Sequence, residues 1–165
     1  MPQRPYLPFM RLTGLIFASL LLGFLPAVAG HSPPKVFLRV HIQTAGQGLP
    51  ETQATTIELP PDGETIQIRA IPEVTERNLI DVKTEPDGGV RLFFNHQGSV
   101  ALNVATGENQ GRIMVVLING YVAYAPVIDE QITDGQLVIP HRLNDLAISA
   151  LQEVARENAR QANKT

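Results

Sequence analysis

The side chains that most often carry chemistry are present in this chain, but their spacing matches no catalytic or metal-binding motif. The four histidines include no pair at i, i+4, and the chain has no cysteine to join them, so it holds no zinc motif; they are His31, His41, His96 and His141. The pattern of residue types places His41 on the outward face of a strand and His96 at a helix start. We therefore predict no metal site and no cofactor.

The carboxylates and hydroxyls of the chain likewise match no catalytic motif. Asp129, Glu130 and Asp134 are close enough in sequence to suggest acid–base work, but two of them flank turns, where aspartate is common. Ser99 and Ser149 lie in helical stretches without the G-x-S-x-G elbow of a serine nucleophile. We predict no catalytic residue and a protein that is not an enzyme. An envelope hydrolase of unrecognised type is the alternative.

The polar cluster that comes nearest to a ligand site is formed by Thr106, Asn109 and Arg112. Residues 107–111 contain two glycines but lack the following lysine and the preceding strand of a phosphate-binding loop. We interpret the segment as the end of a helix, where a glycine adopts the left-handed conformation. In this interpretation Asn109 bonds backbone groups and Arg112 lies at a strand edge.

A hairpin follows this cluster directly and must position it. An apolar run over 113–118 precedes Asn119-Gly120, and a second run contains Tyr121 and Tyr124. Asn-Gly strongly favours a two-residue turn. Such a turn needs a positive φ at both of its central residues, and asparagine followed by glycine can adopt it at little steric cost. The two tyrosines are our candidates for partner binding, since tyrosine offers contact area and a polar group. The alternative is that they form a cross-strand pair that stabilises the hairpin.

Further strands are predicted on both sides of this hairpin. Residues 36–44 alternate in the manner of a strand with one buried face. Four aliphatic residues are predicted to face the core and the four between them to face outward; the first set is Val36, Leu38, Val40 and Ile42, and the second is Phe37, Arg39, His41 and Gln43. Residues 55–59 and 65–70 flank a Pro-Pro-Asp-Gly turn and predict a second hairpin. Short strands are also indicated at 90–94 and 137–139.

Helices complete the pattern. Thr75 can cap a short helix, and Asn144 can cap a last, amphipathic one. Between them, small and branched residues over 98–106 have helical spacing, with Asn95 or His96 as the cap. The order of strands and helices, with short turns, predicts an α+β fold in which an antiparallel β-sheet carries two main helices packed on one face.

Composition limits the domain organisation and the partners. The chain has 165 residues, a net charge of -3 and 44% hydrophobic residues, which is typical of one globular domain with appendages. Its mild acidity argues against a nucleic-acid partner. We predict a linker over 30–35, a single domain over 36–158 and a frayed tail over 159–165.

The first 29 residues have the order of a secretory signal peptide. Arg4 and Arg11 precede an uncharged apolar run, and small residues follow at Ala27 and Ala29. We predict cleavage after Ala29, which would place the protein in the periplasm or outside the cell. The alternative is an uncleaved anchor in the inner membrane, because 12–29 is long enough to span a bilayer core of about 30 Å. Membrane contact would then involve this segment alone.

A combination of motifs points to a family. The chain contains Thr-x-x-Asn-x-Gly-Arg, then Asn-Gly-x-Val-x-x-Ala-Pro-Val-Ile, then Ile-x-x-Gly; the matching residues are Thr106, Asn109, Gly111, Arg112, Asn119, Gly120, Ala125, Pro126 and Gly135. From Pro72 to about Glu153 the chain therefore resembles the periplasmic first-domain head of SecD, an accessory subunit of the bacterial protein-export translocon. Asn119 stands where that family usually has aspartate.

This resemblance implies a head-like fold and a link to protein export. SecD carries membrane spans after its head, and because this chain stops after one helix we expect it to lack the motor function. We predict a non-enzymatic exported module of the cell envelope that binds a partner, either an envelope protein or an unfolded secretory polypeptide. A second resemblance, to the single-span ExbD and TolR motor subunits, requires an aspartate in the membrane helix, and 12–29 contains no ionisable residue.

Overall fold

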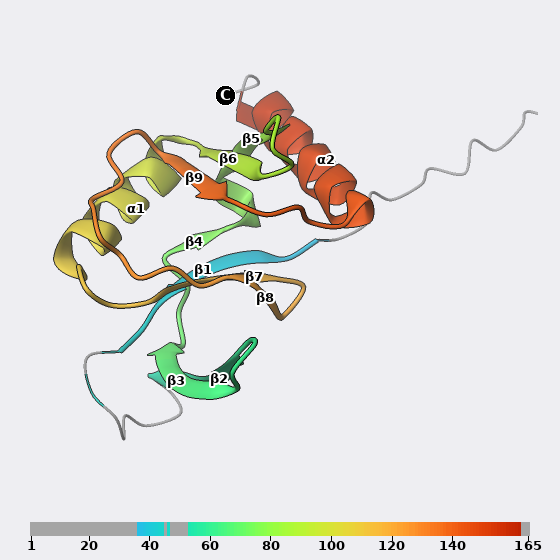
Figure 1. Ribbon diagram of the computed structural model, residues 1–165. Coiled ribbons are helices and arrows are strands. Elements are labelled where there is room, and N and C mark those ends of the chain that lie inside the picture. Colours follow the sequence, from blue (N-terminus) through green and yellow to red (C-terminus); the bar gives the residue numbers. More distant parts are fainter. Residues whose placement is uncertain (1–35, 45, 47–52, 163–165) are drawn as a thin grey trace, which may run out of the picture. The chain divides into compact units, whose positions relative to one another are not determined.

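The computed structural model describes residues 36–44, 46 and 53–162 (Figure 1). The predicted leader and linker, residues 1–35, lie outside the described residues. The same holds for 163–165, the end of the predicted tail.

The largest sheet forms around β1 (Leu38–Ile42) and has the strand order β4-β1-β7-β8. Its other strands are β4 (Val74–Thr75), β7 (Met114–Ile118) and β8 (Tyr121–Tyr124), and all neighbours are antiparallel. β1 therefore pairs on both sides with segments far away in the sequence. β1 can occupy this position inside the sheet because its alternate apolar residues bury one of its faces in the core.

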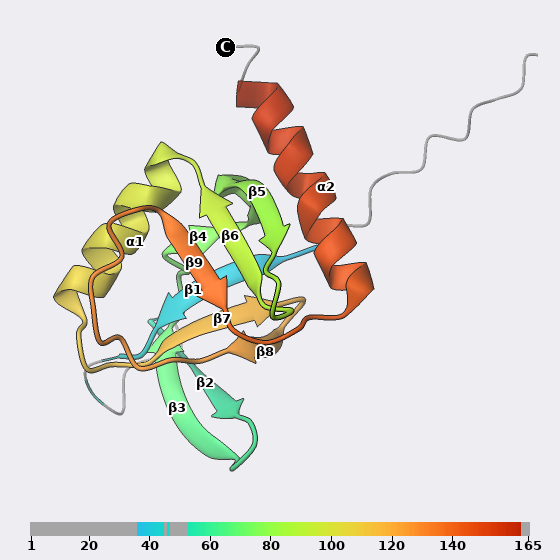
Figure 2. The ribbon, with the colours of Figure 1, turned by 45° about the horizontal axis from the view of Figure 1, so that its top comes forward.

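The remaining strands form two smaller sheets. β5 (Leu79–Thr84), β6 (Val90–Phe94) and β9 (Gln136–Ile139) make an antiparallel three-stranded sheet in this order. β2 (Ala54–Leu59) and β3 (Glu64–Arg69) make the predicted second hairpin. The four-stranded sheet lies between this hairpin and the three-stranded sheet, as Figures 1 and 2 both show.

Three helical segments are present in the described residues: a 3-10 turn η1 (Glu76–Asn78), α1 (His96–Glu108) and α2 (Asp145–Ala162). Each begins after a residue whose side-chain oxygen accepts a hydrogen bond from a backbone N–H of the first turn, as predicted; these residues are Thr75, Asn95 and Asn144. Local capping chemistry therefore determines where the helices start.

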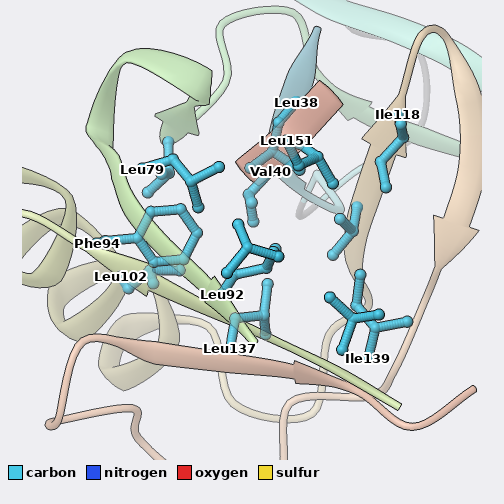
Figure 3. Close-up of a cluster of buried hydrophobic side chains, with 14 of the residues drawn as sticks. Leu38, Val40, Leu79, Leu92, Phe94, Leu102, Ile118, Leu137, Ile139 and Leu151 are labelled. Atoms are coloured by element: carbon cyan, nitrogen blue, oxygen red, sulfur yellow. The ribbon is translucent and has the colours of Figure 1, made fainter. Parts of the chain in front are cut away.

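The main core lies where the four-stranded sheet, the three-stranded sheet and both helices meet (Figure 3). Leu38 and Val40 enter it from β1, and Leu102 and Leu151 enter it from α1 and α2. All four side chains are inaccessible to solvent. Because both sheets and both helices contribute, none of them can bury its apolar face without the others.

A second, smaller cluster lies on the opposite face of the four-stranded sheet. Leu59, Ile66 and Ile68 of the hairpin β2–β3 pack there against Val115 of β7. The hairpin is also tied to the end of β1, since Thr44 N donates a hydrogen bond to Gln67 O at 2.8 Å. The hairpin thus covers part of a sheet face that would otherwise be exposed to water.

The α+β class is confirmed, and the strands are divided among three sheets instead of one. The pattern did not predict β4 or β5. β5 contains Asp81 and Lys83, which are exposed at the edge of its sheet, so its apolar signal is weak. α2 covers this strand and Gln152 donates a hydrogen bond to Val82 O at 3.3 Å, so the strand depends on a helix 70 residues away.

Two expectations about single positions were wrong. His41 was placed on a solvent-facing side of its strand, but its exposed fraction is 4%, because the hairpin β2–β3 covers that face. Residues 159–162 were assigned to a frayed tail, yet α2 continues through Ala162. Asn158 anchors this end of the helix by donating hydrogen bonds to Glu76 O and Leu79 O, both at 2.8 Å.

Candidate functional site

The Asn119-Gly120 turn joins β7 to β8 as predicted and forms one rim of the candidate site. Its two residues have φ values of 52° and 84°, the positive values that this turn requires. The Asn119 side chain accepts a hydrogen bond from Phe37 N at 2.9 Å, and Asn119 N donates to Phe37 O at 2.8 Å. The turn is therefore fixed to the residue that precedes β1.

Beside this turn lies a groove with a volume of about 340 Å³, which we call the hairpin groove. It is bounded by the inner face of the hairpin β2–β3 and by the outer face of the four-stranded sheet. Its main lining residues are Ile57 and Ile68 of the hairpin, Leu117 of β7, and Phe37, Arg39 and His41 at β1. The groove is mostly apolar and open to solvent, which suits contact with an extended segment better than catalysis.

Among the described residues, Arg39 is the one charged side chain that lines the hairpin groove. Its guanidinium lies over the Phe37 ring, 6.0 Å from the ring centroid, a distance at which a cation and an aromatic face attract each other. The ion pairs within the described part of the chain do not include Arg39. The groove therefore combines apolar walls with a positive group.

His41 forms part of the groove floor and is neutral near pH 7. Its Nδ1 lies 2.8 Å from Arg69 O, and because a carbonyl only accepts, Nδ1 carries the proton. Burial lowers the pKa of His41 below 6.5; the bond to Arg69 O opposes this, the nearby Arg39 charge adds to it, and Glu73 opposes it. The polar ring thus serves the fold by linking β1 to the end of β3.

The predicted cluster of Thr106, Asn109 and Arg112 is brought together, but it is largely buried. Asn109 has an exposed fraction of 3%. Its Oδ1 accepts from Arg112 Nη1 at 2.9 Å and from Arg69 Nη2 at 3.3 Å, and its Nδ2 donates to Ala105 O at 2.8 Å. Asn109 thus joins the end of α1 to the end of β3 and the start of β7, which is a structural task.

Thr106 and Gly135 fasten the long loop after β8 onto α1. Thr106 Oγ1 donates to Leu102 O at 2.7 Å and accepts from Ile132 N at 2.9 Å. Gly135 has a φ of 68°, and a Cβ there would collide with the Ser99 side chain. The loop can therefore approach the helix closely only because this residue is glycine.

Three further motif residues belong to the same loop and its partner segment. Gly111, with a φ of 79°, donates from its N–H to Ile128 O at 2.8 Å. Pro126 O accepts from Met114 N at 2.9 Å, and Ala125 packs against the smaller core cluster. The nine motif residues therefore act together as a scaffold that holds the β7–β8 hairpin and the following loop.

That loop encloses a second hollow of about 460 Å³, which contains the carboxylates considered above. Asp129, Glu130 and Asp134 are all exposed. Arg91, at the same hollow, is paired with Glu85 at 2.6 Å. Within the described residues, no group of three or more His, Asp or Glu side chains is arranged to hold a metal ion.

The two candidate tyrosines occupy different environments. Tyr121 is 80% exposed, whereas Tyr124 is partly buried against the main core, with its ring 6.0 Å from that of His141 in an edge-to-face arrangement. Both belong to β8, where they lie opposite Ile118 and Val116. The cross-strand pair was therefore a wrong interpretation, and of the two only Tyr121 presents a free aromatic surface.

The sequence analysis missed the residues of the hairpin groove. Phe37 and Arg39 were assigned to the polar, outward face of a strand, and Ile57 to a short hairpin. A detectable signal was present, because Phe37 is a large aromatic residue at an outward position and remains 48% exposed. Phe37 lines the groove together with Ile57, Ile68 and Leu117, and a contiguous apolar patch of this kind marks an interaction surface.

The family described as SecDF, P1 head subdomain, matches residues 51–159. No curated protein matches the sequence. β1, and with it Phe37, Arg39 and His41, precedes the matched segment.

Two solved structures are similar to the chain. One is described as a membrane component SecDF that enhances protein export; the TM-score is 0.53 at 22% identity, covering 74% of this chain and 62% of that chain. The other is SecDF in a super-membrane-facing form, with a TM-score of 0.53 at 23% identity, covering 73% of this chain and 18% of that chain. The chain thus spans less than two thirds of either protein, and identities this low show the fold alone.

Proposed function

Because the chain belongs to the family of SecDF P1 head subdomains, we propose that it is an exported, non-enzymatic module that binds an extended polypeptide in the cell envelope during protein export. The resemblance to a SecD head predicted from the motifs is confirmed by this family match. The solved SecDF described as enhancing protein export supports the functional part of the proposal.

The observation that carries the proposal is the exposed edge of β8 beside the hairpin groove. Among the described strands, β8 pairs only with β7, so its other edge offers backbone N–H and C=O groups to an added strand. Tyr121, next to the turn at the start of β8, is 80% exposed. It lies opposite Ile118, which belongs to the main core, so its ring is on the face of the sheet away from the groove. An extended chain can thus find backbone partners and an aromatic contact at β8, and the apolar groove lies on the other face of the same sheet.

Binding is better supported than turnover. The carboxylates at the second hollow are exposed, where a general acid or base gains little from its surroundings. Asn109 and Arg112 are engaged with each other and with α1. These contacts favour a role in the fold for Asn109 and Arg112 over a role in a reaction.

The envelope location rests on the first 29 residues, which precede the described part of the chain. Their order of basic, apolar and small residues supports export followed by cleavage after Ala29. None of the helices that the structure describes has the length and hydropathy of a membrane span. The order of residues in the first 29 positions leads us to assign the partner to the envelope, as a secretory polypeptide in an unfolded state or another extended envelope segment.

NMR titration of the exported protein with an unfolded secretory polypeptide tests this function. We expect shifts in the amides of β8 and of the Asn119-Gly120 turn, with an affinity in roughly the micromolar range because the contact area is small. Tyr121→Ala should weaken binding with little change in stability. Val104→Ala, which removes an exposed apolar side chain from α1, is the matched control. Shifts confined to other surfaces, or chemical conversion of an added small molecule, would overturn the proposal.

A further inference from the structure

The hairpin groove has a charge pattern that restricts what it can bind. We propose that it selects an extended polypeptide segment in which an apolar side chain lies close to a carboxylate, with the carboxylate contacting Arg39. This inference rests on the proposed function, polypeptide binding, and names the chemistry of the segment that is bound.

The walls of the groove supply the apolar half of this recognition. Ile57, Ile68 and Leu117 line it, and Phe37 is 48% exposed at its edge. The volume of about 340 Å³ lies at the lower end of the range of roughly 300–1,000 Å³ that is typical of ligand sites. A groove of this size admits a few side chains of an extended segment and excludes a folded domain.

Arg39 supplies the polar half, because none of the ion pairs among the described residues involves its guanidinium. Glu73 is paired with Arg69 at 2.7 Å, and Glu76 accepts a hydrogen bond from Leu38 N at 3.2 Å. The described residues that line the groove include no aspartate and no glutamate. The Arg39 guanidinium therefore keeps its donors for an incoming group.

A carboxylate is the group that fits this guanidinium best. Arginine presents its donors in a planar fork that matches both oxygens of a carboxylate, and such charge-assisted bonds are stronger than neutral ones. The contact between Arg39 and the Phe37 ring holds the fork at the edge of the apolar walls. A segment with adjacent apolar and acidic side chains can thus use both at once.

The two residues that combine the positive charge with an aromatic ring lie in β1 and directly before it. Phe37 and Arg39 precede residues 51–159, which match the family, and the hairpin closes over them from within that match. The residues that carry the selectivity therefore lie outside the part of the chain that matches the family.

Three peptides that differ in one residue test the inference. Each is an extended peptide with two leucines, followed by glutamate, glutamine or lysine. Titration of the exported protein, followed by NMR, gives an affinity for each peptide and shows whether the amides of Ile57 and Leu117 shift. We expect the glutamate peptide to bind about fivefold more tightly than the glutamine peptide, the scale of a partly exposed ion pair, and the lysine peptide most weakly. The preference should shrink as salt is added.

Variants of the protein locate the effect. Arg39→Gln should bind the glutamate and glutamine peptides equally, and Arg39→Lys should keep part of the preference. Arg156→Gln, which removes an exposed arginine from α2 outside the groove, should keep all of it. Because Arg39 is itself exposed, these variants should fold, and thermal unfolding checks that they do.

The outcomes separate this inference from the proposed function. Equal binding of the glutamate and glutamine peptides to the wild-type protein would overturn the selectivity and leave polypeptide binding in place. A preference that survives Arg39→Gln, or that shifts amides outside the groove, would overturn the role of Arg39. If no peptide and no unfolded polypeptide binds, the proposed function itself is wrong.

Discussion

Phe37 and Asn119 are joined by two reciprocal hydrogen bonds, although 82 residues separate them in the sequence. Phe37 N donates to the Asn119 side chain at 2.9 Å, and Asn119 N donates to Phe37 O at 2.8 Å. The Asn119-Gly120 turn, whose conformation depends on its own two residues, therefore also holds the start of β1. The exposed Phe37 ring and the tip of the β7–β8 hairpin are consequently kept on the same side of the molecule.

Gly120→Val should destabilise the protein through its backbone alone. Gly120 has a φ of 84°, and a Cβ there would meet no atom within 4 Å, so no steric clash contributes. We expect a loss in the free energy of unfolding of about 1–3 kcal/mol, the usual scale of backbone strain, measured by urea unfolding. Gly120→Asn is the matched control and should lose less, since asparagine tolerates positive φ. A valine variant as stable as the wild-type protein would contradict this account of the turn.

Asn109→Ala should be costly because it leaves two guanidinium groups without their shared acceptor. Arg112 and Arg69 both donate to Asn109 Oδ1, and Ala105 O loses its donor as well. We expect a loss of about 1–3 kcal/mol in the free energy of unfolding, the range for unsatisfied buried polar groups. Gln110→Ala, at an exposed position next to it, should change stability little. Equal effects of the two variants would show that the buried network contributes nothing special.

His41 should make stability depend on pH. Its pKa is lowered by burial, so the unfolded chain binds a proton at higher pH than the folded protein does. The contribution is therefore fully present above pH 6.5 and is lost as the pH falls below 6.5 towards the folded-state pKa. The charged groups that act on the ring are Arg39 on β1 and Glu73 before β4, and Arg69 on β3 contacts it through its backbone carbonyl.

Urea unfolding between pH 7.5 and pH 5 measures this dependence. His41→Gln should flatten the pH profile, because a neutral side chain replaces the group that titrates. His96→Gln, which changes an exposed histidine on α1, should leave the slope due to His41 intact. A His41→Gln profile that is as steep as that of the wild-type protein would assign the dependence to other groups.

The leader should be removed on export. Ala27 and Ala29 are small residues at the positions that a signal peptidase requires, and Gly30 follows them. Mass spectrometry of the exported protein should give a mature N-terminus at Gly30. Ala29→Arg should block processing, whereas the matched control Val28→Leu, between the two small residues, should not. Recovery of intact Met1 in the membrane fraction would establish the uncleaved anchor.

Features that depend on a few neighbouring residues could be predicted from the sequence alone. Asn119-Gly120 supplies two positive φ values at little cost, so the hairpin follows from local chemistry. Asn95 and Asn144 cap their helices for the same reason, since the acceptor and the donor lie three residues apart. The family motifs were also recognisable, because the residues that fasten the loop to α1 form short, fixed patterns.

Only the tertiary structure decided which faces were covered. His41 looks like a solvent-facing residue in an alternating strand, and the hairpin β2–β3 buries it from 28 residues away. Asn109 meets Arg69 across 40 residues, and Phe37 and Arg39 become a groove wall only when that hairpin closes over the sheet. Alternation reports the two faces of a strand but not what packs on each, because that depends on the burial of apolar surface between distant segments.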